Sequence, residues 1–149
     1  MAITQAIANS FKKQLLDGDQ DFTAAPAGDI FKLALYTSSA TLTSATTSLL
    51  TSSPTHEVTS ANYSAGGGAL VNNPTSLTAG VARADFADLS FQNVTLTARG
   101  ALIYNTSSAT TNSAVCVLEF GGDKTATSGT FTVQFPAPTS TAAILRISG

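Results

Sequence analysis

The sequence contains no tryptophan, one cysteine (Cys116) and one histidine (His56) among its 149 residues. A single cysteine cannot form a disulfide within the chain, so the cysteine content does not indicate an oxidising compartment. A single histidine has no histidine partner with which to bind a metal ion. Charged residues make up only 11% of the chain, less than half of the roughly 25% in an ordinary domain. We therefore expect neither a disulfide scaffold nor a histidine-based metal centre.

Positive charge is scarce as well, with seven basic residues, a formal net charge of −2 and one basic pair, Lys12 and Lys13. Nucleic-acid binding needs a basic patch, so we expect no nucleic-acid partner. No apolar run approaches the roughly 18 residues of a membrane span. The first residues also lack the basic segment and apolar run of a signal peptide. We expect no membrane association, and synthesis in a cytoplasm.

What the chain has instead is a large share of apolar and hydroxyl-bearing residues. Hydrophobic residues form 43% of the sequence, and serine and threonine together supply 40 positions. This content is enough for a chain of one domain's length to bury a core. Disordered chains combine low hydrophobicity with high net charge, and this chain has neither. We predict a single domain over residues 1–149 with a neutral, hydroxyl-rich surface.

The first sixteen residues carry the pattern of an amphipathic helix. Ile3, Ile7, Phe11 and Leu15 recur at every fourth position, and Gly18 is suited to end the helix in a left-handed conformation. We predict an N-terminal helical arm over residues 1–17. Its apolar stripe must cover either its own sheet or a neighbouring molecule, and the packing of short helices favours its own sheet.

From residue 29 onward the apolar residues alternate with polar ones, which is typical of half-buried strands. No helical pattern lies between these segments, so a parallel α/β fold is disfavoured. The sequence predicts an all-β fold, an antiparallel β-sandwich or jelly-roll-like domain over residues 29–149, preceded by the short α-helix. The clearest predicted strands are 31–36, 81–86, 89–91, 94–97, 101–104, 114–120, 130–135 and 142–147.

Two segments between predicted strands are long. Residues 37–55 are mostly serine, threonine and alanine, with Leu49 and Leu50 near their end, and predict a surface excursion with a short helix between Ser44 and Leu50. Residues 121–129 contain three glycines and predict the long tip of a hairpin between the strands at 114–120 and 130–135.

Three carboxylates at alternate positions, Asp17, Asp19 and Asp21, have the spacing with which calcium loops begin. Such a loop also needs glycine at its sixth position and glutamate at its twelfth, where this chain has Phe22 and Gly28. A solvated helix end explains the three carboxylates better. We expect no metal and no cofactor.

Groups suited to catalysis are few. His56 is a possible lone general base, but Cys116 lies in an apolar strand pattern in which a thiol usually fills the core. Asp85 and Asp88 flank Phe86 at a predicted strand end, where a turn accounts for both. We expect no enzyme and no catalytic residue.

Several segments resemble small structural proteins of tailed-bacteriophage virions. They are residues 31–40 (FKLALYTSSA), 97–105 (TARGALIYN), 114–124 with its GGDK end, and 129–136 (GTFTVQFP). The resemblance covers most of the chain and is weakest between residues 41 and 80. Its motifs are strand and turn segments, so they indicate a family more than a mechanism.

The resemblance implies capsid decoration: a cement protein in the virion, made in the host cytoplasm, that binds the capsid exterior and stabilises it. The implied partner is the major capsid protein or another virion protein, and a homotrimer is expected by analogy. The helical arm and the excursion then become arms that reach neighbouring subunits, although both fit equally well on their own domain. The candidate partner contacts are Ile3, Ile7, Phe11, Leu15, Leu49 and Leu50.

Two alternatives stay open. One places the protein in the neck, the tail or the base of a fibre. The other is a glycan- or receptor-binding sandwich, for which Tyr36, Tyr63 and Tyr104 would have to supply a small aromatic platform.

Overall fold

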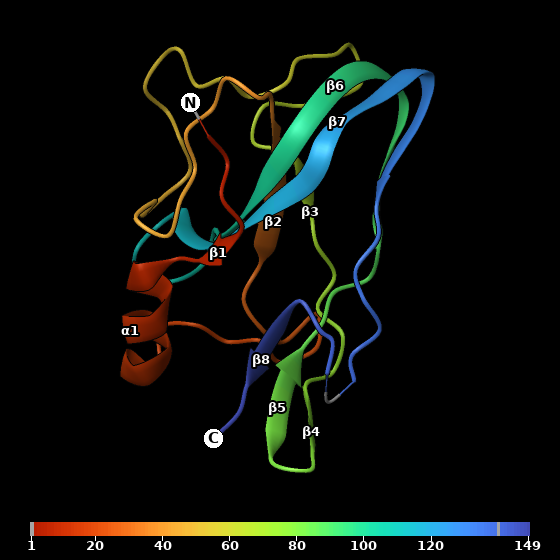
Figure 1. The fold of residues 1–149 in the computed structure, drawn as a ribbon. Coiled ribbons are helices and arrows are strands. Elements are labelled where there is room, and N and C mark those ends of the chain that lie inside the picture. The colour runs from red at the N-terminus through yellow and green to blue at the C-terminus, as the bar shows by residue number, and fades with distance from the viewer. Residues whose placement is uncertain (1, 140) are drawn as a thin grey trace.

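The computed structural model describes residues 2–139 and 141–149, and confirms an all-β, antiparallel, sandwich-like fold with one short helix, α1 (Asn9–Asp17) (Figure 1). One sheet has the strand order β1 (Ala6–Ile7), β7 (Ser113–Val133), β6 (Leu89–Asn105), β2 (Phe31–Tyr36) and β3 (Gly68–Ala69). The other has the order β4 (Ser76–Thr78), β5 (Val81–Ala84) and β8 (Leu145–Ile147).

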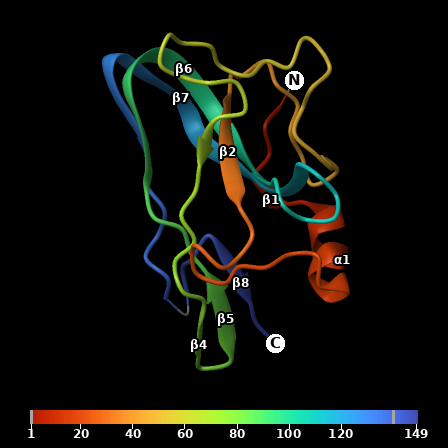
Figure 2. The same ribbon diagram turned by 180° about the vertical axis from the view of Figure 1, so that it is seen from behind.

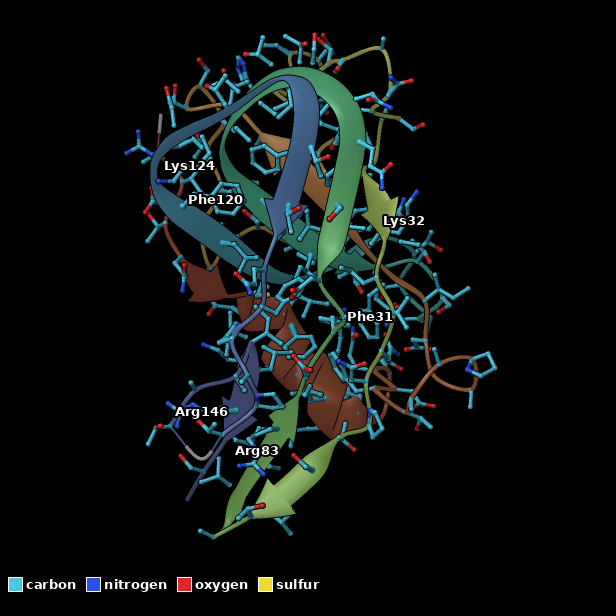
Figure 3. All side chains as sticks on the ribbon, turned by 90° about the vertical axis from the view of Figure 1, so that its right-hand side faces the viewer. Phe31, Lys32, Arg83, Phe120, Lys124 and Arg146 are labelled. Carbon is cyan, nitrogen blue, oxygen red and sulfur yellow. The ribbon has the colours of Figure 1, made fainter. Side chains whose placement is uncertain are left out.

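A long, bent hairpin of β6 and β7 dominates the molecule (Figure 3). Its strands pair from Leu89 opposite Val133 to Asn105 opposite Ser113, and residues 106–112 form its turn. The short strands predicted at 89–91, 94–97 and 101–104 are one strand, and so are those at 114–120 and 130–135. The prediction of a hairpin tip at 121–129 was wrong, because these residues continue β7.

The pairing of the hairpin is interrupted at several places, and at one of them β7 has four residues, 120–123, opposite Arg99 alone. Gly121 has φ 77° there, a conformation that suits glycine. Arg99 Nε donates to Glu119 Oε1 at 2.9 Å, and this bond raises the pKa of Arg99 and lowers that of Glu119. The turn-like residues of this segment therefore form a β-bulge, which curves the hairpin without ending its strands.

A chain of phenylalanine rings links the helix to the five-stranded sheet and to the segments that follow β5 and β7. Phe11 of α1 meets Phe22 edge to face at 5.8 Å, and Phe22 stacks on Phe31 of β2 at 4.5 Å. Phe31 lies 5.5 Å from Phe86, which lies 5.8 Å from Phe135. Distances of 4.5–7 Å are those of favourable aromatic pairs. The core thus continues from the helix into the body of the domain.

The N-terminal helix is shorter than predicted, because it begins at Asn9 and not in the first residues. Residues 6 and 7 form β1, which pairs with Val117 and Cys116 of β7, and Ile3 bridges Leu42. This pairing gives the backbone groups of residues 6 and 7 hydrogen-bond partners on the edge of β7. In the first turn of a helix, the N–H groups of these residues would have no partner within the helix. Gly18 ends the helix with φ 78°, as expected. Figure 2 shows the helix beside β1, at the side of the molecule.

The excursion at residues 37–55 is tied to the body of the domain and contains no helix, so the short helix predicted between Ser44 and Leu50 was wrong. Leu42 is buried and exchanges backbone hydrogen bonds with residues 2 and 4. Thr47 accepts a backbone hydrogen bond from Ala114 at 2.9 Å. Hydrogen bonds to distant parts of the chain hold this segment, which includes turns at 38–39 and 44–45, against the domain.

Candidate interaction surface

A largely apolar groove lies between α1 and the three-stranded sheet, with a volume of about 390 Å³. We call it the helix groove. The spacing of the helix puts its apolar residues on one side, and the alternation of β5 and β8 supplies the facing wall. Its apolar walls include Phe11, Leu15 and Leu16 from the helix and Ala82, Leu145 and Ile147 from the sheet.

Large apolar side chains are left uncovered around this groove. Leu16 is 91% exposed, Leu77 is 73% exposed and Ile147 is 61% exposed. Leu77 and Ile147 are both cross-strand partners of Ala82, so the three side chains form one row on one face of the sheet. A gathering of exposed apolar residues beside a groove is typical of a binding surface.

Positive charge lies beside the apolar row. Arg83 of β5 and Arg146 of β8 are direct cross-strand partners and lie at the same end of the molecule (Figure 3). Arg83 is buried and donates to the Ser76 and Thr78 hydroxyls at 3.1 and 2.8 Å. Lys12, Arg83 and Arg146 line the groove, and no aspartate or glutamate among residues 2–139 and 141–149 lines it. The two arginines alternate along their strands with Ala82, Leu145 and Ile147, so the side chains that face the helix are mainly apolar.

The predicted partner contacts fall in three places. Ile7, Phe11 and Leu15 line the helix groove, and Phe11 is only 2% exposed because it packs into the core. Ile3 lies against the hairpin at Gly100. Leu49 and Leu50 line a separate hollow in the excursion. All of them except Phe11 are partly buried against the core of their own domain.

Sequence reasoning missed the part of this surface that lies on the sheet. Leu77 and Ile147 sit on strands of three residues, too short for an alternation to stand out. Leu16 follows the helix stripe in the sequence, and its near-complete exposure depends on where the helix packs. The pairing of β4, β5 and β8, which no local pattern announces, brings these residues together.

The residues considered for catalysis are either buried or in contact with other segments of the domain. Cys116 is buried in β7, and burial raises the pKa of its thiol to about 12. Asp85 accepts a hydrogen bond from the Asn73 side chain at 2.7 Å, and Asp88 accepts one from the backbone of Phe135 at 2.9 Å. His56 lies beside Leu49 and Leu50 in the hollow of the excursion. The two aspartates therefore fasten neighbouring segments.

The three carboxylates at the end of the helix and just beyond it do not converge with other ligands. Asp17 pairs with Lys13, and Asp21 accepts hydrogen bonds from the backbone and hydroxyl of Thr23, which lower the pKa of Asp21. Within the described part of the chain, no three His, Cys, Asp or Glu side chains are grouped so that they could hold a metal ion.

All three tyrosines gather around the half-buried Glu57, which the sequence did not reveal. Glu57 accepts hydrogen bonds from the Tyr63 hydroxyl and from the backbone of Gly66, both at 2.7 Å. The Tyr104 hydroxyl donates to the carbonyl oxygen of Gly66. Burial, as the largest cause, raises the pKa of Tyr36, Tyr63 and Tyr104. These phenols are neutral and buried.

This burial corrects one expectation. Tyr36, Tyr63 and Tyr104 are each less than a tenth exposed, so they do not form the aromatic platform that the glycan-binding alternative requires.

Comparisons with protein-family models, with curated proteins and with solved structures give no match to this chain. No helix in residues 2–139 and 141–149 is long and apolar enough to cross a membrane.

Proposed function

We propose that this chain is a non-enzymatic structural protein of a tailed-bacteriophage virion, a cement protein that binds the capsid exterior and stabilises the shell. The observation that carries the proposal is the helix groove, whose uncovered Leu16 and Ile147 are suited to contact another protein. The exposed Leu77 extends this apolar surface, because it lies in one row of the sheet with Ile147. Apart from this groove, the surface is rich in serine and threonine and poor in charge. Such a surface can hydrogen-bond a partner at little cost in charge desolvation.

The segments that resemble phage virion proteins also support the proposal, because they are neighbours in space. Residues 31–36 form β2, which pairs along its whole length with residues 100–105 of β6. Residues 114–124 and 129–136 fall almost entirely in β7, the other strand of the hairpin. The resemblance therefore concerns one continuous sheet, which is the scaffold of the domain.

The test is to locate the protein on intact particles and to measure what its loss does. Particles are prepared with and without the protein, labelled with an antibody against it and imaged. We expect many copies spread over the shell, and release of DNA at a lower temperature from particles that lack the protein. Label confined to the neck, the tail or a fibre base would support that alternative instead. Equal heat resistance of the two kinds of particle would contradict a cement role.

A further inference from the structure

The helix groove has an apolar projection at its own rim. Leu16 of α1 lines the groove and is nevertheless 91% exposed, so its side chain stands out from the surface. Across the groove, Ile147 of β8 is 61% exposed. One face of the molecule therefore presents both a projecting leucine and an apolar hollow. Two copies related by a two-fold axis present the same patch to each other, so Leu16 of each copy can enter the groove of the other.

The charges of the helix are ordered along the chain. Lys12 and Lys13 precede Leu16, whereas Asp17 and Asp19 follow it. If two helices pack antiparallel about their Leu16 residues, the turn before Leu16 in one copy lies beside the turn after Leu16 in the other. The basic turn of each copy then meets Asp19 of its partner. A parallel arrangement would bring like charges together, which is destabilising.

Two of these four charges have no ion pair within their own chain. Lys13 pairs with Asp17, which is the largest cause of the raised pKa of Lys13, whereas Asp19 is the smallest cause. Lys12 and Asp19 are in none of the salt bridges among the described residues. Lys12 Nζ donates to the Asn9 side chain at 3.3 Å, a long bond to a neutral group. A second copy is therefore able to pair both free charges.

We propose that a second copy of this chain covers the helix groove, in a two-fold dimer whose α1 helices pack antiparallel. Leu16 of each copy enters the groove of the other beside Ile147, and Lys12 pairs with Asp19 across the interface. The charge order favours a second copy over an unrelated protein, because an antiparallel pair of these helices is complementary to itself. The inference rests on the proposed function only in that the pair, and not the single chain, would be the unit on the shell.

Sedimentation equilibrium of the full chain measures this association. We expect a monomer–dimer equilibrium with a dissociation constant below about 1 mM. Leu16→Gln keeps a side chain suited to a helix but removes an apolar contact from each copy, and should raise the dissociation constant at least about tenfold. Ile30→Gln is the matched control, because Ile30 is 58% exposed and lies outside the groove, and should leave the constant unchanged. Circular dichroism checks that each variant is folded.

An exchange of charge between copies tests the antiparallel arrangement. Lys12→Glu places a glutamate beside Asp19 of the partner, and Asp19→Lys places a lysine beside Lys12 of the partner. Each variant alone should therefore dimerise about tenfold more weakly than the unmodified chain. In an equimolar mixture, one copy of each variant forms a dimer with opposite charges at both contacts. The mixture should associate about as strongly as the unmodified chain, whereas a charge pair within one copy would not be restored by mixing.

A chain that stays monomeric up to about 1 mM would overturn the inference and leave the groove to another virion protein, and a trimer would overturn it as well. Equal dissociation by Leu16→Gln and Ile30→Gln would contradict it, and so would a mixture of the charge variants that associates no better than either alone. If the chain is monomeric but covers the shell, only this inference fails. If it dimerises as expected but particles contain no copies, only the proposed function fails.

Discussion

Ile3 packs so closely over Gly100 that a Cβ atom on residue 100 would lie 2.8 Å from Cγ2 of Ile3. The same atom would lie 2.4 Å from the carbonyl oxygen of Leu118, which belongs to the backbone of β7. Gly100 stands opposite Glu119, beside the bulge at residues 120–123. Only glycine leaves room for this approach, so the extended N-terminal segment and the bulge meet at one position.

Gly100→Ala should therefore destabilise the protein. Ile3 can rotate away from an added methyl group, but the Leu118 carbonyl cannot, so strands β6 and β7 would have to separate locally. We expect a loss of about 1–3 kcal/mol in the free energy of unfolding, the usual cost of overpacking, measured by urea denaturation. Gly121→Ala is the control, because open space surrounds that position and only its φ of 77° opposes alanine. A Gly100→Ala variant as stable as Gly121→Ala would contradict the close approach.

Phe11 and Leu16 test whether the helix belongs to the domain. Phe11 is 2% exposed against Phe22, whereas Leu16, on the same helix, is 91% exposed. Phe11→Ala should cost about 3–5 kcal/mol in unfolding free energy, as for other buried aromatic residues. Leu16→Ala should change it by less than about 0.5 kcal/mol. Equal, small effects in thermal and urea unfolding would mean that the helix is a free arm.

The sequence was informative where a pattern is local. The alternation of residues 31–36 predicted β2, and Gly18 predicted the end of the helix. The helix start could not be predicted, because Ile3 and Ile7 fit a helical stripe and also fit an extended segment beside β7. The glycines at 121 and 122 look like a turn, and only their pairing opposite Arg99 makes them a bulge.

The sequence predicted the helix side of the candidate surface but not its sheet side, because only patterns within one segment can be read from a sequence. The helix stripe identified Ile7, Phe11 and Leu15, because a period of four residues can be read from the sequence. Leu77 and Ile147 lie 70 positions apart, and only the pairing of both strands with β5 brings them into one row. The gathering of the three tyrosines around Glu57 depends in the same way on long-range packing.

Cys116 should be unreactive in the folded protein. Its side chain is buried in β7, and burial raises the pKa of the thiol from about 9 to about 12, so almost no thiolate forms at pH 8. A thiol reagent such as Ellman's reagent should label the native protein only at the rate at which it unfolds, and should label it rapidly in urea. Fast labelling in native buffer, with circular dichroism unchanged, would contradict this burial.

The three tyrosines should make the protein unstable in alkali. Burial raises the pKa of each phenol above its usual value of 10, and that of Tyr104 to about 12. The unfolded chain therefore releases these protons at a lower pH than the folded one, so their contribution to stability is complete below pH 10 and is lost as the pH rises toward the folded-state pKa. We expect tyrosinate absorbance to stay low in the native protein past pH 10 and to rise together with unfolding.

Tyr104→Phe should reduce the slope of stability against pH above pH 10, because one of the three linked protons is removed. Reversible titration of all three phenols near pH 10, with the circular dichroism spectrum intact, would contradict their place around Glu57.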